Sequence, residues 1–486
     1  MKRAFSQKTH IPLLSLPALI LSSCSQEELP GRVATTDDIT ITFITSLPGV
    51  GSRSLSGTEE KSLDAGFDVT AFSKEGESDS DGKHNTFFEE QHVSKDVDGA
   101  FRSESCRWPD NKGDHEGHLK FFAFYPSRDA MHSSIAEDED SGHFNLTNHS
   151  AKDENEVIYD YRLENFKIHR DISRHIDFVT AAGEGTKTEN LYSGVNLEFQ
   201  HHLSRISLQA WGASTDYNVE IAGVRIGRPV TEGDFNLAAT SEAISDGDNT
   251  IGAWILGETP IRNSVEYIFS DAGDSVIPID GKSHTTQATA ASVMGLGGYP
   301  MVIPYSHEAW DHNNDAPNEN EGMYFSVLLR VCDKSGLQLY PYPATAAGED
   351  ESDGDEKKMA VIYLSVDPNT GKVLKRLYKV GDSYYTDPES SADTLYSADE
   401  AEEIREYGWA AVPVKTEWKA GYEYTYALDY TKGVGVQDPE DPYPGTPILM
   451  PLTTGADGPD MLEEVTTHKV TNLDVINKNK PIQMGK

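Results

Sequence analysis

Basic residues and cysteines are both scarce in this chain of 486 residues. There are 41 Lys and Arg against 80 Asp and Glu, so the formal net charge is −39. DNA and RNA are bound through clusters of Lys and Arg that neutralise phosphates, and nothing in the sequence resembles such a cluster. We therefore exclude a nucleic-acid-binding protein.

The three cysteines are too few to form a disulfide framework. Apart from Cys24 in the N-terminal region, only Cys106 and Cys332 are available. They lie too far apart in the sequence to form a metal knuckle. Two alternatives remain for this pair, namely two idle thiols or one long-range disulfide.

A short leader opens the chain. A positively charged start precedes an apolar run, residues 11–21, which is too short to span a bilayer as a helix. The following Leu21-Ser22-Ser23-Cys24 resembles a bacterial lipobox, in which a peptidase cuts between Ser23 and Cys24 and the cysteine is acylated. We predict a lipoprotein signal peptide over residues 1–23 and a lipid anchor at Cys24. The alternative is an ordinary signal peptide with an incidental cysteine.

Ser25 follows the cysteine where inner-membrane lipoproteins have Asp, which resembles an outer-membrane sorting signal. The next residues, Gln26-Glu27-Glu28, are similar to acidic signals for export to the cell surface. We therefore expect the mature protein at the outer membrane, exposed on the surface.

The rest of the composition favours strands and turns, because there are 40 Gly, 24 Pro, 22 Tyr and 17 Phe. Apolar and polar residues alternate in short runs separated by turn clusters, the period of half-buried β-strands. The predicted strands cover 39–45, 67–71, 119–125, 195–199, 206–210, 219–226, 324–331, 360–366 and 373–380. The sequence therefore predicts an all-β protein.

Local signals add detail to this prediction. The alternation changes phase at Gly223, which predicts a β-bulge, and Asp367-Pro368-Asn369-Thr370-Gly371 predicts a hairpin turn. We expect the runs at 324–331 and 360–366 to be central strands of one sheet. One helix of about ten residues is predicted from Ser397, which opens a capping box, to a C-terminal cap at Gly408.

No metal site, cofactor motif or catalytic motif is predicted. His307 and His312 are five residues apart, whereas a zinc-protease helix needs a spacing of four. His201 and His202 are adjacent on a strand and point to opposite faces. The acidic stretches 75–81, 137–140 and 349–356 are predicted to be solvated loops rather than calcium sites.

The chain resembles the fimbrillin-like family, the lipoprotein subunits of type V pili. The resemblance is carried by the lipobox at Cys24 and by a series of segments in a characteristic order. These segments are Ile39–Thr45 followed by Arg53, Trp108-Pro109, Leu119–Pro126, Asp177–Ala181, Val195–Ile206 and Trp418–Tyr426. Acidic insertions make the chain longer than a typical stalk subunit.

The resemblance implies two tandem transthyretin-like β-sandwich domains with Greek-key connections, few short helices and no enzymatic activity. A linker-like stretch at 183–189 favours a domain boundary there, and a boundary nearer residue 240 is the alternative. The expected divisions are a signal peptide (1–23), a propeptide with the first strand (24–53), an N-terminal domain (54–186), a C-terminal domain (187–440) and a tail (441–486).

The resemblance also implies processing. In the family, an arginine-specific protease removes the segment that contains the first strand, and the emptied groove accepts a strand from another subunit. The expected cut lies between Arg53 and Ser54, because Arg53 is in a Gly-rich loop after the strand; the alternative is an ordinary loop arginine. Ile39, Ile41 and Phe43 form the apolar face of the exchanged strand, and the tail is the expected donor.

The function predicted on this basis is a structural subunit of a cell-surface fimbria, stalk or tip, that binds other subunits and mediates adhesion. The alternative is a surface lipoprotein that binds glycans without polymerising. The stripe of Tyr422, Tyr424 and Tyr426 would suit carbohydrate stacking, but strand alternation into a core explains it more simply. A surface hydrolase would need a constellation of catalytic groups that the sequence does not display.

Overall fold

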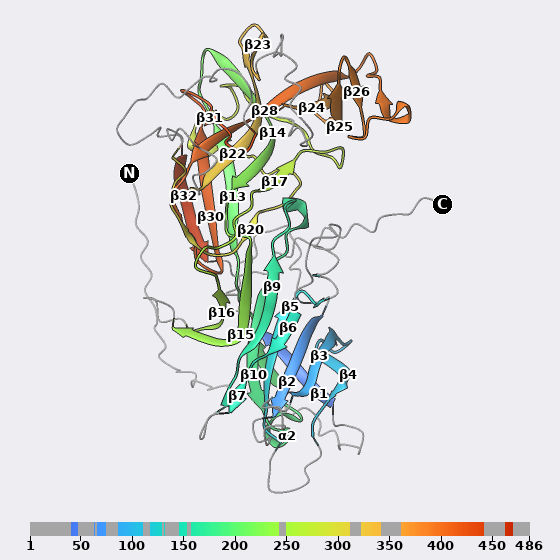
Figure 1. The fold of residues 1–486 in the computed structure, drawn as a ribbon, viewed down its shortest axis with the longest axis vertical. Coiled ribbons are helices and arrows are strands. Elements are labelled where there is room, and N and C mark those ends of the chain that lie inside the picture. Colours follow the sequence, from blue (N-terminus) through green and yellow to red (C-terminus); the bar gives the residue numbers. More distant parts are fainter. Residues whose placement is uncertain are drawn as a thin grey trace, which may run out of the picture. The chain divides into compact units, whose positions relative to one another are not determined.

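The computed structural model describes residues 40–46, 63, 66–73, 86–109, 117–128, 131, 145–152, 157–242, 249–311, 322–341, 361–441 and 462–469. Nearly all of the elements drawn in Figure 1 are strands, so the predicted all-β class is confirmed. The helical segments described are α2 (Lys187–Asn190) and the short 3-10 turns η2 (Ile172–Arg174), η3 (Gln287–Thr289) and η4 (Ala392–Thr394). No helix in this part of the chain is long and apolar enough to cross a membrane.

The first sheet has eight strands and contains the predicted first strand. In spatial order the strands are β11 (Val195–Glu198), β1 (Thr40–Ser46), β4 (Phe101–Arg107), β3 (Thr86–Lys95), β2 (Phe67–Ser73), β5 (Leu119–Tyr125), β10 (Val179–Gly185) and β12 (Gln200–His201). One face of this sheet encloses a core of aromatic and aliphatic side chains that includes Ile41, Phe43 and Phe121.

A second core lies between two further sheets. One has β19 (Ala291–Ser292), β13 (Ser204–Trp211), β30 (Tyr422–Asp429) and β32 (Leu462–Lys469), with β20 (Met301–Val302) beside β13. The other has β17 (Val265–Ile268), β14 (Tyr217–Gly227), β22 (Tyr324–Asp333), β28 (Glu403–Pro413), β24 (Val361–Val366), β25 (Val373–Val380), β26 (Ser383–Tyr385) and β27 (Leu395–Tyr396). Three short strands pair with its interior strands: β18 (Ile277–Ile279) with β14, β23 (Gln338–Tyr340) with β22 and β31 (Val436–Gln437) with β28.

The remaining strands form smaller sheets. These are β16 (Asn249–Ile255), β15 (Glu232–Glu242), β9 (Tyr161–Lys167) and β6 (Asn145–Asn148) in one sheet, and the pairs β21 (Ser306–His307) with β29 (Thr416–Glu417) and β7 (Ala151–Lys152) with β8 (Val157–Ile158). A third apolar cluster joins side chains of β9 and β15 to Phe122 and Phe124 of β5.

Several local predictions are confirmed. The register of β14 against β22 shifts between Ile221 and Gly223, where the bulge was predicted. A Cβ at Gly223 would lie 2.7 Å from the carbonyl oxygen of Tyr267, so the close approach of β17 requires glycine there. β24 and β25 pair across the predicted hairpin turn. β22 and β24 both pair with β28 in one sheet, as expected.

The helix predicted from Ser397 to Gly408 is wrong, because Glu403–Pro413 is strand β28. β28 pairs with β22 on one side and β24 on the other, so its backbone groups are satisfied by two ladders. A helix of about ten residues is marginal without tertiary support, and burial of Tyr407 and Trp409 in the sheet outweighs its capping signal.

The stretch at 183–189 is not a linker. Gly183–Gly185 complete strand β10, which pairs with β5, and Lys187 begins helix α2. The following strands β11 and β12 both belong to the first sheet. The acidic stretches predicted to be solvated loops lie outside the described residues.

Candidate functional site

Strand β1 occupies an interior position in the first sheet. It runs antiparallel to β4 on one side and parallel to β11 on the other, so both of its edges are hydrogen-bonded. Ile41 and Phe43 are fully buried, whereas Ile44 is 49% exposed. The predicted inward face of this strand is therefore present at the two described positions. Ile39, its third predicted member, lies outside the described residues.

Phe43 is the main apolar anchor of β1. Its ring contacts Phe121 and Phe67 edge-on, with centroids 5.4 Å and 6.2 Å away. Burial of two such side chains contributes about 3–6 kcal/mol, at roughly 1.5–3 kcal/mol each.

Strand β11 depends on β1 for its hydrogen-bonding partners. Among the described strands, β11 pairs with β1 alone, at the end of the sheet. Gly194, just before β11, has φ of +76°, and a Cβ there would lie 3.1 Å from the carbonyl oxygen of Thr42. Loss of β1 would therefore leave unpaired backbone groups on both β4 and β11.

We call the surface that holds β1 the β1 socket; it consists of the facing edges of β4 and β11 and the apolar side chains beneath β1. Two charged residues flank it. The Nε–H of Arg102 donates to the hydroxyl of Thr42 over 3.1 Å, and exposed Glu198 is the register partner of Ser46. The socket thus combines an apolar floor with one basic and one acidic position.

Cys106 belongs to the same core as β1 and is fully buried. Burial raises the pKa of its thiol to about 12, which makes it unreactive at neutral pH. Cys332 is half-buried, and both thiols are free. Of the two alternatives for this pair, the structure therefore has idle thiols.

Histidines singled out in the sequence have structural partners. His201 Nδ1 lies 2.9 Å from Asp177, and His202 Nε2 lies 2.7 Å from the Thr180 hydroxyl. His307 Nδ1 lies 3.1 Å from the Thr416 hydroxyl. His312 lies outside the described residues. Among the described residues, no group of His, Cys, Asp and Glu is arranged to hold a metal ion.

The tyrosine stripe on β30 is part of a core, as the simpler interpretation predicted. Tyr424 and Tyr426 are buried, and the Tyr426 hydroxyl accepts a hydrogen bond from the indole of Trp418. These rings are therefore not available as a carbohydrate platform.

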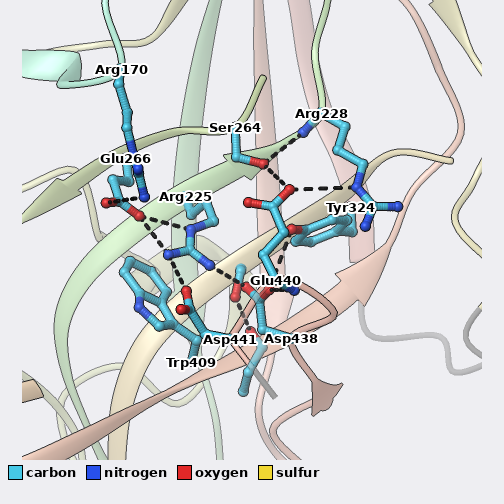
Figure 2. Close-up of polar contacts among 12 residues, drawn as sticks. Arg170, Arg225, Arg228, Ser264, Glu266, Tyr324, Trp409, Asp438, Glu440 and Asp441 are labelled. Carbon is cyan, nitrogen blue, oxygen red and sulfur yellow. Dashed lines mark hydrogen bonds and ion pairs between the residues drawn. The ribbon is translucent and has the colours of Figure 1, made fainter. Parts of the chain in front are cut away.

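Figure 2 shows a polar cluster that sequence reasoning missed, centred on Arg225 of β14. The guanidinium donates to Glu266 at 2.6 and 2.8 Å and to Asp438 at 3.0 Å, and it lies 2.5 Å from a carboxylate oxygen of Asp441. Its carbon lies 4.2 Å from the ring centre of Trp409. The only signal in the sequence was a charged residue within an apolar strand.

Charge balance stabilises this buried arginine cluster. Burial disfavours the charged form of Arg225, but the carboxylates of Asp438 and Glu266 outweigh it and raise its pKa. Burial raises the pKa of Asp438, partly offset by Arg225. Burial also opposes ionisation of Glu266, yet Arg225 and Arg170 lower its pKa. Removal of Arg225 alone would leave these carboxylates buried without their cation, which is strongly destabilising.

The cluster fixes the segment that follows β31. A second layer of contacts joins Glu440 to the Ser264 hydroxyl at 2.6 Å and to Arg228 at 3.4 Å. Asp438–Asp441 directly follow β31, and Asp441 is the first residue of the predicted tail. We call this segment the tail root; the arginine cluster ties it to β14 and β17.

The remaining predicted site residues, Ser23, Cys24, Arg53 and Ser54, lie outside the described residues. Of the predicted donor tail, Leu462–Lys469 is described as strand β32. It runs antiparallel to β30, with Lys469 opposite Tyr422.

The fold and the socket together define an all-β protein whose first strand is an interior strand of its own sheet. Residues 58–290 match a family model described as fimbrillin-like. The resemblance to the fimbrillin-like family is thereby confirmed over these residues. No curated protein matches the chain.

Solved structures also resemble the chain. A candidate cell adhesion protein from Bacteroides eggerthii is 10% identical, with a TM-score of 0.33, and the match covers 90% of this chain and 98% of the other. One from Bacteroides ovatus is 10% identical, with a TM-score of 0.31 and coverage of 89% and 96%. The fimbrial anchor protein Mfa2 from Porphyromonas gingivalis is 12% identical, with a TM-score of 0.22 and coverage of 62% and 80%.

Proposed function

We propose that the protein is a structural subunit of a cell-surface fimbria that assembles by strand exchange after proteolysis. In this proposal a protease cuts between Arg53 and Ser54, β1 leaves with the propeptide, and the tail of a second copy fills the β1 socket. The protein has no catalytic activity of its own in this proposal, and other fimbrial subunits are its partners.

The observation that carries this proposal is the interior position of β1. An edge strand would leave a sheet intact when removed, whereas β1 separates β4 from β11 and covers an apolar floor. The emptied socket would expose two hydrogen-bonding edges and buried aromatic rings in one place. Such a gap is a template for a strand from another chain.

The lipid anchor and the domain division are part of the same proposal. Acylated Cys24 holds the precursor at the outer membrane, and cleavage after Arg53 frees the subunit from this anchor. We also propose two β-sandwich domains in tandem. Strands β11 and β12 belong to the first sheet. We therefore place the boundary between the two domains after His201 rather than after residue 186.

The test uses the chain that begins at Ser25, with Cys332→Ser so that Cys106 is its one thiol. We expect this protein to be monomeric and its Cys106 to be unreactive toward a thiol reagent. Cleavage by an arginine-specific protease should make Cys106 react and convert monomers into detergent-resistant ladders. Arg53→Ala should block both changes, and Arg32→Ala should block neither, because Arg32 precedes β1.

Two outcomes would reject strand exchange. One is a wild-type protein that stays monomeric with a protected Cys106 after clean cleavage at Arg53. The other is an Arg53→Ala protein that polymerises as readily as wild type. Protein sheared from cells with β1 still attached would favour the alternative function, a glycan-binding lipoprotein that does not polymerise.

A further inference from the structure

One end of the sheet that runs from β17 to β27 extends beyond the core against which the sheet packs. Strand β24 is part of that core, since Leu364 is fully buried, and β25, β26 and β27 follow it outward in the sheet. Leu364 is the register partner of Arg376 on β25, so both side chains point to the same face of the sheet. At Arg376, which is exposed, this face is no longer covered by the described part of the chain.

We call the uncovered surface the tyrosine face; it consists of Arg376, Tyr378, Val380, Tyr385 and Leu395. Tyr378, Tyr385 and Leu395 are register partners on three successive strands, so they form a row across β25, β26 and β27. Arg376 and Val380 lie two residues to either side of Tyr378 and share its face. Val380 is 48% exposed, Leu395 is 56% exposed, and both tyrosines are half-buried. Exposed apolar side chains gathered in one place mark a binding surface.

The hydrogen-bonding groups of the tyrosine face are open. No described residue forms a hydrogen bond with the hydroxyl of Tyr378 or Tyr385, and none forms a hydrogen bond or salt bridge with the side chain of Arg376. The guanidinium carbon of Arg376 lies 5.6 Å from the ring centre of Tyr378, which attracts the cation to that ring. The face thus offers hydroxyl groups beside a positioned cation.

The exposed charge of Arg376 is unusual among the described residues. With 41 basic residues against 80 acidic ones, carboxylates are abundant, and most other described arginines pair with one, as Arg225 and Arg405 do. The carboxylate of Glu266 is close enough to feel the charge of Arg376, but its hydrogen bonds are to Arg225 and Arg170. An exposed arginine that has no salt bridge is complementary to an anionic ligand.

The opposite face of the same strands is closed on itself. Tyr363 and Tyr384 contact each other edge-on, with ring centroids 5.4 Å apart. The ammonium nitrogen of Lys379 lies 5.5 Å and 5.7 Å from their ring centres, and Leu377, the register partner of Tyr363, is buried. The two faces of β25 therefore differ, because the side chains of one pack against each other and those of the tyrosine face do not.

We propose that the tyrosine face binds an acidic polysaccharide. The C–H groups of a sugar ring pack on the electron-rich face of an aromatic ring, and sugar hydroxyls form hydrogen bonds with the hydroxyls of Tyr378 and Tyr385. Arg376 binds the carboxylate of a uronic acid through its fork of N–H donors. This inference goes beyond the proposed function and does not depend on strand exchange.

The size of the tyrosine face favours a polysaccharide over a protein partner. A standard protein interface takes about 20–30 residues from each partner, far more than this face offers. Neighbouring strands lie about 4.8 Å apart, so the row from Tyr378 to Leu395 is about 10 Å long, which accommodates a short stretch of a sugar chain. One arginine also carries too little charge to neutralise a nucleic-acid backbone.

The test compares two charge-removing substitutions on strand β25, in the uncleaved chain that begins at Ser25. Polygalacturonate, a polymer of a uronic acid, is the probe, and calorimetric titration measures its dissociation constant. We expect Arg376→Ala to weaken binding about tenfold or more, because it removes the cation of the tyrosine face. Lys379→Ala removes the same charge from the opposite face and should leave binding within about twofold of wild type.

Tyr385→Ala tests the aromatic part of the tyrosine face. It should weaken binding about three- to tenfold, whereas Tyr384→Ala, at the adjacent position on the opposite face, should not. Leu395→Ala, at an exposed position of the row, is a further variant that removes stacking area without disturbing a core. Urea denaturation of each variant verifies that it is folded under the conditions of the titration.

Three outcomes would overturn the proposal. The first is a wild-type protein that does not bind polygalacturonate. The second is equal weakening by Arg376→Ala and Lys379→Ala, which would show attraction by the charge of the strand alone. The third is binding of polyglutamate as tight as that of polygalacturonate, which would identify a site for acidic peptides. Ladder formation after cleavage tests strand exchange separately, so the failure of one proposal leaves the other intact.

Discussion

Phe43 on the first strand lies edge-on against Phe121 on β5, with ring centroids 5.4 Å apart. Their strands are not neighbours in the sheet, so the contact crosses the apolar core enclosed by this sheet. The first strand is thus held by packing as well as by its two ladders.

Phe43→Ala should weaken the hold on β1. Removal of a fully buried Phe costs about 3–5 kcal/mol in unfolding free energy, because it loses apolar burial and leaves a cavity. Urea denaturation measures this loss, and Cys106 should become reactive in the folded protein. Ile44→Ala, at a neighbouring position that is 49% exposed, is the control and should change stability by less than about 1 kcal/mol. Equal effects of the two substitutions would contradict the burial argument.

Arg225→Met should destabilise the C-terminal sheets by about 3–5 kcal/mol, because it leaves the carboxylates of Asp438 and Glu266 buried without their cation. We also expect proteases to cut the chain near residue 441 more readily, since the tail root loses its tie. Unfolding curves and limited proteolysis measure these effects.

Arg170→Ala is the matched control for this cluster. Arg170 also contacts Glu266, but its side chain is 65% exposed, so its loss should cost less than about 1 kcal/mol. If Arg225→Met unfolds at the wild-type urea concentration, the cluster is not a structural tie.

Buried His202 should make the protein sensitive to mild acid. Burial lowers the pKa of His202 to about 3, so the folded state keeps it neutral while the unfolded chain binds a proton near pH 6.5. Stability from this group is present above pH 6.5 and is lost as the pH falls toward 3. Between pH 7 and pH 5 the loss is about 2 kcal/mol, which His202→Gln should remove.

Urea denaturation of wild type and His202→Gln at both pH values checks this prediction. His149→Gln, at a side chain that is 50% exposed, is the control. A pH dependence that is the same in all three proteins would show that His202 does not contribute to it.

Cys24→Ser should abolish lipid attachment, because acylation requires the thiol. Cells supplied with a labelled fatty acid should label the wild-type protein only, and the variant should be lost from the outer-membrane fraction. Substitution of the adjacent Ser25→Ala is the control, since it keeps the thiol. Undiminished label in Cys24→Ser would reject the lipobox interpretation.

The sequence predicts which segments are strands wherever one face of the strand is buried. Ile41 and Phe43 alternate with Thr40 and Thr42, and a period of two places both apolar side chains in the core whatever the strand pairs with. The bulge at Gly223 was visible for the same reason, as a change in the phase of the alternation. The helix predicted from Ser397 was wrong, because a capping signal is local and pairing of β28 with two neighbouring strands outweighed it.

Only the tertiary structure decided which strands flank β1, because pairing joins residues that are far apart in the chain. Phe43 is in register with Phe101 on one side and Val195 on the other, and no local pattern encodes such partners. The arginine cluster is likewise assembled from Arg225, Glu266 and Asp438, each unremarkable among the many charged residues of this sequence. Local periodicity specifies which way a side chain points, whereas the partner it meets depends on how separate strands pack together.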